Sequence, residues 1–152
     1  MNTRPLALVP AVLVLVAACS SGGASSSAPS AETSDAPASA ATRIEVSLVD
    51  TLRIEPSPMT VPAGVPVTFV VTNTGAIEHE FFIGDEAAQA DHEAEMLEMG
   101  GMSHDEPAGI AVDPGVTKEL TFTFAEPGET LAGCHVVGHY GAGMKVTIVV
   151  TE

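Results

Sequence analysis

The sequence predicts an all-β domain, a sandwich of roughly seven or eight short strands within residues 42–152. Three observations point to this fold. Apolar and polar residues alternate in short runs from position 43 onward, which is the pattern of half-buried strands. Proline and glycine separate these runs, as tight turns require. Only residues 84–107 lack the alternation, and their composition favours a helix. Many short strands joined by turns favour a β-sandwich.

The expected strands follow in chain order. Ile44, Val46 and Leu48 form one apolar face of the first strand. A second strand over 52–59 is interrupted by two prolines. Further strands are expected at 66–74, 78–83, 109–112, 117–124, 130–134 and 144–151, with turns at 61–64, 113–115 and 126–129. The residues expected to point inward include Val67, Phe69, Val71, Leu120, Phe122 and Phe124.

The first 41 residues are not expected to belong to the fold. A mostly apolar run before Cys19 predicts a signal peptide over 1–18, too short to span a bilayer. Residues 16–19 resemble a bacterial lipobox, which implies that Cys19 is lipidated and anchors the protein to the outer face of the cell membrane. An ordinary secretory signal, giving a secreted or periplasmic protein, is the alternative. Residues 19–41 then form a flexible tether with a reach of about 26 Å.

The composition is strongly acidic. Asp and Glu number 20 against 5 Lys and Arg, for a formal net charge of −15. This charge excludes nucleic acid as a partner, because phosphate binding requires basic residues. An acidic surface favours basic protein partners, and it is also compatible with no partner at all.

One glycine-rich stretch, residues 133–144, holds three side chains that bind metals. Cys134, His139 and Met144 are separated from each other by four residues. The intervening glycines permit a tight loop that can aim all three side chains at one point. Thiolate and thioether favour Cu(I), imidazole suits both copper states, and two histidines with a cysteine and a weak methionine form a blue-copper set. The loop lacks one histidine.

His79 is the candidate for the missing ligand. It lies in a short strand-like run, on the same face as Phe81 and Ile83, whereas Glu80 and Phe82 point to the opposite face. A ligand that shares a face with two apolar residues should be shielded from water. A ligand from a separate strand would also hold the loop against the body of the domain.

This pattern of an upstream histidine followed by Cys134, His139 and Met144 resembles that of the cupredoxins, the small blue-copper family of plastocyanin, azurin, rusticyanin and sulfocyanin. The resemblance covers residues 42–152 and implies a Greek-key β-sandwich with one type 1 copper ion. It implies that His79, Cys134 and His139 are equatorial ligands and that Met144 is the long axial one. It also implies that His139 is the more exposed histidine, through which electrons pass.

Each of these residues taken singly has a simpler explanation. Cys134 could be a small core residue and Met144 a gap filler before the last strand. Their joint occurrence in one loop favours a metal site, although zinc could also occupy a Cys, His, His set. If Cys19 carries lipid, Cys134 has no partner for a disulfide, and metal ligation explains a lone thiol in an exported protein.

Two residues bear on how far the resemblance extends. Plastocyanin and azurin have Asn after the first histidine, where it braces the ligand loop, but this chain has Glu80. The reduction potential of those proteins therefore does not transfer to this one. His135 directly follows Cys134, but Gly133 stands where multicopper oxidases and nitrite reductases have a second flanking histidine. We expect His135 to point away from the copper, at the surface or beside the ligands, rather than to bind metal.

Residues 84–107 form an acidic, methionine-rich insertion. Helix formers fill 87–99, acidic residues suit the helix start at 85–86, and Gly100 and Gly101 suit its end. The favoured interpretation is a helix that packs onto the sandwich through Met96, Leu97 and Met99, with His92 and His104 in solvent. The alternative is a second, transient Cu(I) site. Its ligands would be His92, Met96, Met99, Met102 and His104.

The expected function is to carry single electrons through one type 1 copper, with another redox protein as partner. The alternative is copper trafficking or tolerance, with a copper donor or acceptor as partner and the membrane reached through the N-terminal lipid. We do not expect an enzyme, because the chain offers neither a further copper centre nor a hydrolytic motif.

Overall fold

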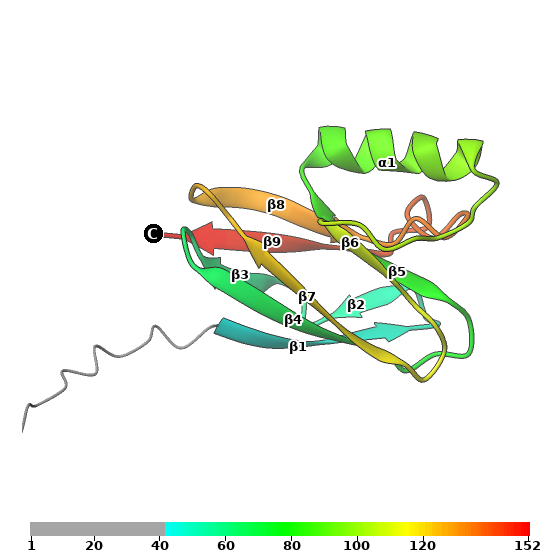
Figure 1. The fold of residues 1–152 in the computed structure, drawn as a ribbon, viewed down its shortest axis with the longest axis horizontal. Coiled ribbons are helices and arrows are strands. Elements are labelled where there is room, and N and C mark those ends of the chain that lie inside the picture. Colours follow the sequence, from blue (N-terminus) through cyan, green and yellow to red (C-terminus); the bar gives the residue numbers. More distant parts are fainter. Residues whose placement is uncertain (1–41) are drawn as a thin grey trace, which may run out of the picture. The chain divides into compact units, whose positions relative to one another are not determined.

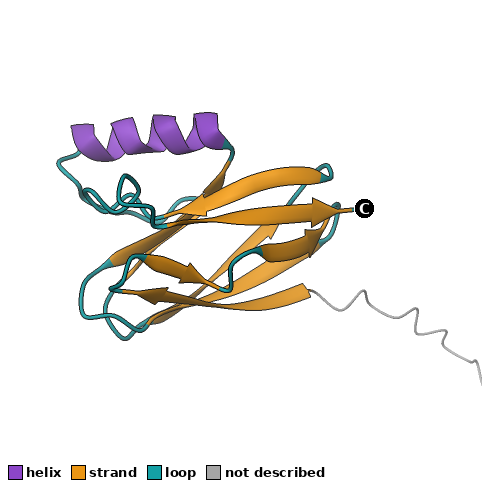
Figure 2. Ribbon diagram, turned by 180° about the vertical axis from the view of Figure 1, so that it is seen from behind, coloured by secondary structure: helices purple, strands orange, loops and turns teal. Residues whose placement is uncertain are grey.

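The computed structural model describes residues 42–152. The expected signal peptide 1–18, Cys19 and the tether 19–41 lie outside the described residues. Within that range the chain forms two β-sheets packed face to face, with one helix on the outer face of the second sheet (Figures 1 and 2). The predicted all-β sandwich with a helical insertion is confirmed. No helix in the described range is long and apolar enough to cross a membrane.

The first sheet has the strand order β2-β1-β4-β7 and the second the order β3-β9-β8-β5-β6. β1 runs parallel to β4 and β3 parallel to β9, and the other neighbours are antiparallel. The chain changes sheet at every connection from β2 to β5, and again between β6 and β7 and between β7 and β8, which ties the two layers together. The strands are β1 (Thr42–Val49), β2 (Arg53–Glu55), β3 (Met59–Pro62), β4 (Pro66–Asn73), β5 (His79–Gly84), β6 (Gly109–Val112), β7 (Thr117–Thr123), β8 (Gly128–Gly133) and β9 (Lys145–Thr151).

The core lies between the two sheets and follows the predicted alternation. Val67, Phe69 and Val71 of β4 are fully buried. The Phe69 ring lies 5.3 Å from that of Phe81 in the facing sheet and 6.3 Å from that of Phe124, both measured between centroids. Burying each such side chain contributes about 1.5–3 kcal/mol, so these contacts fix β5 against the first sheet.

Three predicted features differ from the structure. The strand expected over 52–59 is two separate strands, β2 and β3, which belong to different sheets. The turn expected at 61–64 begins later, because β3 pairs in parallel with β9 and buries Met59 and Val61. This pairing joins segments nearly ninety residues apart, and local pattern does not reveal it. Phe122, expected to point inward, is only half-buried and packs against the edge of the core.

The insertion contains the helix α1 (Glu86–Glu98), close to the predicted 87–99. Asp85 caps its start, with the side-chain Oδ1 accepting a hydrogen bond from the Ala88 backbone N–H at 2.8 Å. Gly100 and Gly101 end it with positive φ angles of 72° and 78°, which favour glycine. The helix covers the outer face of β5 and β8 (Figure 1).

Candidate metal centre

Two antiparallel neighbours, β5 and β8, bring the distant ligands together. Their register pairs Phe82 with Gly133, so His79 at the start of β5 lies at the same end of the sheet as Cys134, just past the end of β8. The loop 134–144 then leads into β9. The sandwich therefore places the imidazole of residue 79 next to the thiol, as the sequence predicted.

Three of the four predicted ligands converge. The Sγ atom of Cys134 lies 3.9 Å from Nδ1 of His79 and 3.4 Å from Nδ1 of His139. One ligand atom from each residue lies within 4.8 Å of the other two. Metal–sulfur bonds of about 2.3 Å and metal–nitrogen bonds of about 2.0 Å separate sulfur and nitrogen by roughly 3.5 to 3.7 Å at tetrahedral to trigonal angles. The spacing therefore fits a single ion shared by these side chains.

Backbone hydrogen bonds close the loop around the site. The Cys134 N–H donates to the Met144 carbonyl at 3.1 Å, and the Met144 N–H donates to the His139 carbonyl at 3.0 Å. Gly138 and Gly143 have positive φ angles of 85° and 97°, which permit these turns. Met144, the predicted fourth ligand, is fully buried, and its backbone joins the positions of the other two loop ligands.

The two histidines differ in exposure. His79 is fully buried, whereas His139 is half-buried. Burial, and then the neighbouring His79, lower the pKa of His139. A lowered pKa keeps its imidazole neutral at physiological pH, which is the form that binds metals.

Asp50 orients His79, and sequence reasoning missed it. Oδ1 of Asp50 lies 3.2 Å from Nε2 of His79, so the ring presents Nδ1 to Cys134. The Ala76 N–H donates to the same carboxylate at 2.8 Å, and this bond, followed by that from His79, lowers the pKa of Asp50. Gly75 is needed here, because a Cβ at that position would lie 1.9 Å from Asp50 Oδ1. A carboxylate that holds a ligand histidine is common at metal sites.

The thiol of Cys134 is deeply buried. Burial raises its pKa to about 11, and the Glu80 and Val136 backbone N–H groups only partly oppose this effect. The Glu80 N–H lies 3.3 Å from Sγ and donates to it. Within residues 42–152, Cys134 is a free cysteine. The metal-free thiol is therefore protonated at neutral pH and must lose its proton to bind a metal.

His135 contacts helix α1 and does not join the three converging residues. Its side chain is directed to Gln89 and Glu93, away from the site, as expected. It is only 1% exposed, so the surface position that was one part of the prediction is wrong. The α1 helix covers it, and no local pattern indicates that cover.

The insertion residues of the hypothetical second copper site differ widely in exposure. Met96 is buried, but Leu97, expected to pack, is 61% exposed because it lies on the outer side of α1. His92, expected in solvent, is 3% exposed and lies 2.9 Å from Glu80. The remaining members of the hypothetical second copper site are Met99, half-buried, Met102, 69% exposed, and His104, half-buried.

Replacing Asp50 with Ala should weaken metal binding, because His79 would lose the partner that fixes its orientation. We expect copper affinity to fall about 10- to 100-fold, measured by competition with a chelator of known affinity. Glu126→Ala, in the turn before β8 at the far end of that strand, is the control and should bind as the unmodified chain does. Equal affinity for both variants would contradict the role of Asp50.

The raised pKa of Cys134 predicts a pH-dependent stability of the metal-free protein. Between the ordinary thiol pKa of 9.0 and the folded value of about 11, the unfolded chain loses the thiol proton while the folded chain keeps it. Stability should therefore fall as pH rises from 9 to 11, by up to about 3 kcal/mol. Denaturant unfolding of the unmodified chain and of Cys134→Ser, which lacks this thiol, measures the difference. If the free energy of unfolding of the two chains changed with pH in the same way, the thiol would not be buried in this way.

Known proteins match both the sequence and the fold. The family model for copper binding proteins of the plastocyanin/azurin family matches residues 40–151. The copper-resistant cuproprotein CopI of Pseudomonas aeruginosa is 33% identical, and the match covers 92% of this chain and 94% of that protein. The protein of the same name from Rubrivivax gelatinosus is 37% identical over 70% of this chain. The match spans only 65% of the Rubrivivax protein's length.

A solved structure shows the same arrangement of strands. The dithionite-reduced auracyanin of the photosynthetic bacterium Roseiflexus castenholzii is 28% identical, with a TM-score of 0.66 over 74% of this chain and 98% of that one. The His-Cys-His cluster also has the donor set and spacing that a single type 1 copper requires. By its sequence, its fold and this donor set, the chain belongs to the plastocyanin/azurin family of copper-binding proteins, the cupredoxins.

Proposed function

We propose that His79, Cys134, His139 and Met144 hold one copper ion and that the domain carries single electrons to and from a partner protein. The observation that carries this proposal is the convergence of Cys134 Sγ with Nδ1 of both histidines. When bound, copper supplies a one-electron couple between its Cu(II) and Cu(I) states. We assign the protein a carrier role and no catalytic turnover of a substrate.

The rigidity of the site supports electron transfer. His79 is held by Asp50, Cys134 by the Glu80 N–H, and the loop by its bonds to Met144. Donor atoms that are fixed before binding need little movement when the charge of the site changes. Such preorganisation lowers the barrier to transfer, because reorganisation is the cost that a flexible site would add.

The half-buried His139 supports a route for electrons. It is the most exposed of the three converging residues. The strongly negative net charge favours a partner with a basic surface.

A copper-loaded full chain should show the intense thiolate-to-copper absorption of a blue-copper site and a reversible one-electron couple in voltammetry. Cys134→Ser should lose the absorption, because serine has no thiolate to donate charge. Cys19→Ser is the control and should keep it. A colourless unmodified chain that prefers zinc would contradict the electron-carrier proposal.

Copper tolerance is a second candidate, and a specific observation favours it. The two CopI proteins, at 33% and 37% identity, are named copper-resistant cuproproteins. A site in a rigid loop can also withdraw copper from solution, since its thiolate and imidazoles bind both copper states. For either role we propose that the protein is exported and tethered by a lipid on Cys19, as residues 16–19 indicate.

Expression of the full chain in a copper-sensitive bacterium tests this second role. The unmodified chain should raise the copper concentration at which growth stops, and Cys134→Ser at equal abundance should not, because it lacks the thiolate. Cys19→Ser should retain its copper site and reveal whether tolerance needs the lipid anchor. If the chain binds copper and is redox-active but does not raise copper tolerance, the tolerance role is refuted and electron transfer stays as the proposed function.

A further inference from the structure

Three side chains of the insertion gather outside the copper cluster. His92 lies on α1, and His104 and Glu106 lie in the segment between α1 and β6. Nδ1 of His104 and Oε1 of Glu106 are buried atoms, and neither has a hydrogen-bond partner within residues 42–152. Buried polar atoms are nearly always paired with protein, water or an ion. Two unpaired atoms of this kind near one histidine therefore require an explanation.

His92 is close to both of these residues. Its Nδ1 lies 3.1 Å from Oε1 of Glu106, and its ring centroid lies 6.1 Å from that of His104. The 3.1 Å contact does not have the geometry of a hydrogen bond, because Oε1 of Glu106 has no such partner. Zinc bonds of about 2.0–2.2 Å to nitrogen and oxygen separate the two ligand atoms by roughly 2.9 to 3.4 Å at right to tetrahedral angles. The contact therefore has the spacing of two ligands of one ion.

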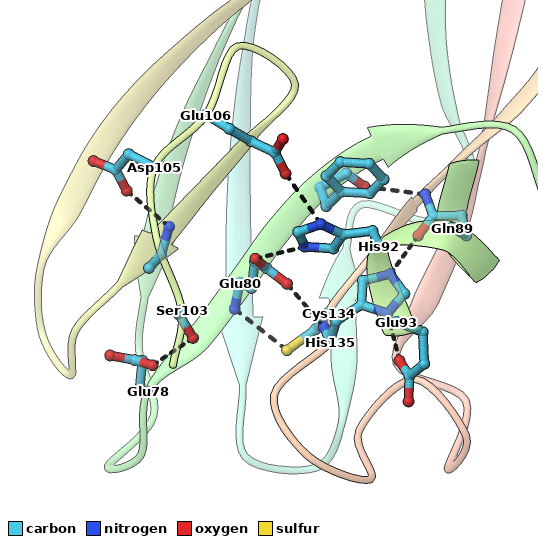
Figure 3. A network of polar contacts seen from close by, with 12 residues as sticks. Glu78, Glu80, Gln89, His92, Glu93, Ser103, Asp105, Glu106, Cys134 and His135 are labelled. Atoms are coloured by element: carbon cyan, nitrogen blue, oxygen red, sulfur yellow. Dashed lines mark hydrogen bonds and ion pairs between the residues drawn. The ribbon is translucent and has the colours of Figure 1, made fainter. Parts of the chain in front are cut away.

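His92 is also oriented as a metal ligand would be. Its Nε2 contacts Oε1 of Glu80 at 2.9 Å, so its other nitrogen, Nδ1, is the one that faces Glu106 (Figure 3). The copper centre has the same arrangement, in which Asp50 contacts Nε2 of His79 and Nδ1 faces the site. A carboxylate that holds one ring nitrogen and directs the other to a metal is a common partner of ligand histidines.

Neighbouring groups hold two of the three residues in place. The ring of His92 stacks on that of Phe82 at a centroid distance of 4.0 Å, with the planes 4° apart. The Glu106 N–H donates to the Gly109 carbonyl at 2.8 Å, and its carbonyl accepts from the Gly109 N–H at 3.2 Å. This tight turn fixes the backbone of Glu106 at the start of β6. His104, two residues earlier, is half-buried in a stretch without helix or strand.

A comparison with the copper centre indicates what binding would change. The rings of His79 and His139 have centroids 5.1 Å apart, against 6.1 Å for His92 and His104, and both pairs are tilted by 48°. The donor atoms of the insertion are thus less closely gathered than those of the copper cluster, which all lie within 4.8 Å. A bound ion would draw His104 toward His92, and the irregular backbone at His104 permits that movement.

We propose that His92, His104 and Glu106 form a second metal site that binds a divalent ion, Zn(II) or Cu(II). Two imidazoles and a carboxylate suit both ions, whereas Cu(I) prefers thiolate and thioether ligands. The site therefore differs from a methionine-based Cu(I) site in the same insertion. The ion would link α1 to the segment that leads into β6. The inference goes beyond the proposed function and uses none of the four residues assigned to the copper ion.

The test uses the full chain with its copper site filled first, dialysed against Zn(II) and then assayed for both metals. We expect one zinc ion per chain in addition to copper, with the thiolate-to-copper absorption unchanged. His104→Ala and Glu106→Gln should each lose the additional zinc, because each removes a ligand. Glu95→Gln, an exposed carboxylate on α1, is the matched control and should keep it. Unchanged far-UV circular dichroism shows that each variant is folded.

Hydrogen exchange locates the ion without reference to the copper site. Zinc should slow exchange of the backbone amides of residues 100–107 in the unmodified chain and in Glu95→Gln, but not in His104→Ala. This measurement needs no thiolate-to-copper band, so it distinguishes failure of the second site from failure of the proposed function. A repetition with Cu(II) should add an ion without a new intense band, since the site has no thiolate, and the relative affinities identify the preferred ion.

Two results would overturn the second site. One is the absence of any zinc beyond that which the copper ligands can hold. The other is additional zinc that His104→Ala and Glu106→Gln retain as fully as Glu95→Gln does, which would place the ion elsewhere on the acidic surface.

Discussion

The burial of Cys134 is the constraint on which the site depends. A fully buried thiol must be held by neighbours, and two strands and one loop supply them. The β5–β8 register ends with Phe82 paired to Gly133, and continuing it by two residues brings Glu80 opposite His135. The Glu80 N–H therefore reaches Sγ, and the loop closes through the bond from Cys134 to the Met144 carbonyl. The sandwich fixes the sulfur before any metal binds.

The insertion is part of this site rather than an appendage. A glutamate side chain in a fully buried position requires hydrogen-bond partners, because a buried polar group without them costs about 1–3 kcal/mol. Helix α1 provides His92 for that purpose and Gln89 for His135. Ser103, beyond the helix, also donates a hydrogen bond to Oε1 of Glu78, just before β5, at 2.7 Å. The insertion thus contacts both strands that carry the site.

How much the sequence predicts depends on whether a signal is local. The spacing of Cys134, His139 and Met144 identified the loop because its glycines and ligands are neighbours in the chain. Strand alternation placed His79 on the core face for the same reason. No local pattern indicates the role of Asp50, because it approaches His79 from the end of β1, across the loop at Gly75. Local sequence patterns also do not predict the parallel pairing of β3 with β9, since it joins segments that are distant in the sequence.

The helix shows why hydrophobic periodicity fails at such a site. Its buried residues are Gln89, His92 and Met96, which have helical spacing but include only one apolar side chain. An apolar face would cost less to bury, because burial of polar groups carries a desolvation cost that their hydrogen bonds must offset. Apolar contacts, however, have no direction, whereas hydrogen bonds fix distance and angle. A site that must hold the Cys134 sulfur 3.4 and 3.9 Å from two histidine nitrogens needs that direction, which explains a polar helix face near Cys134.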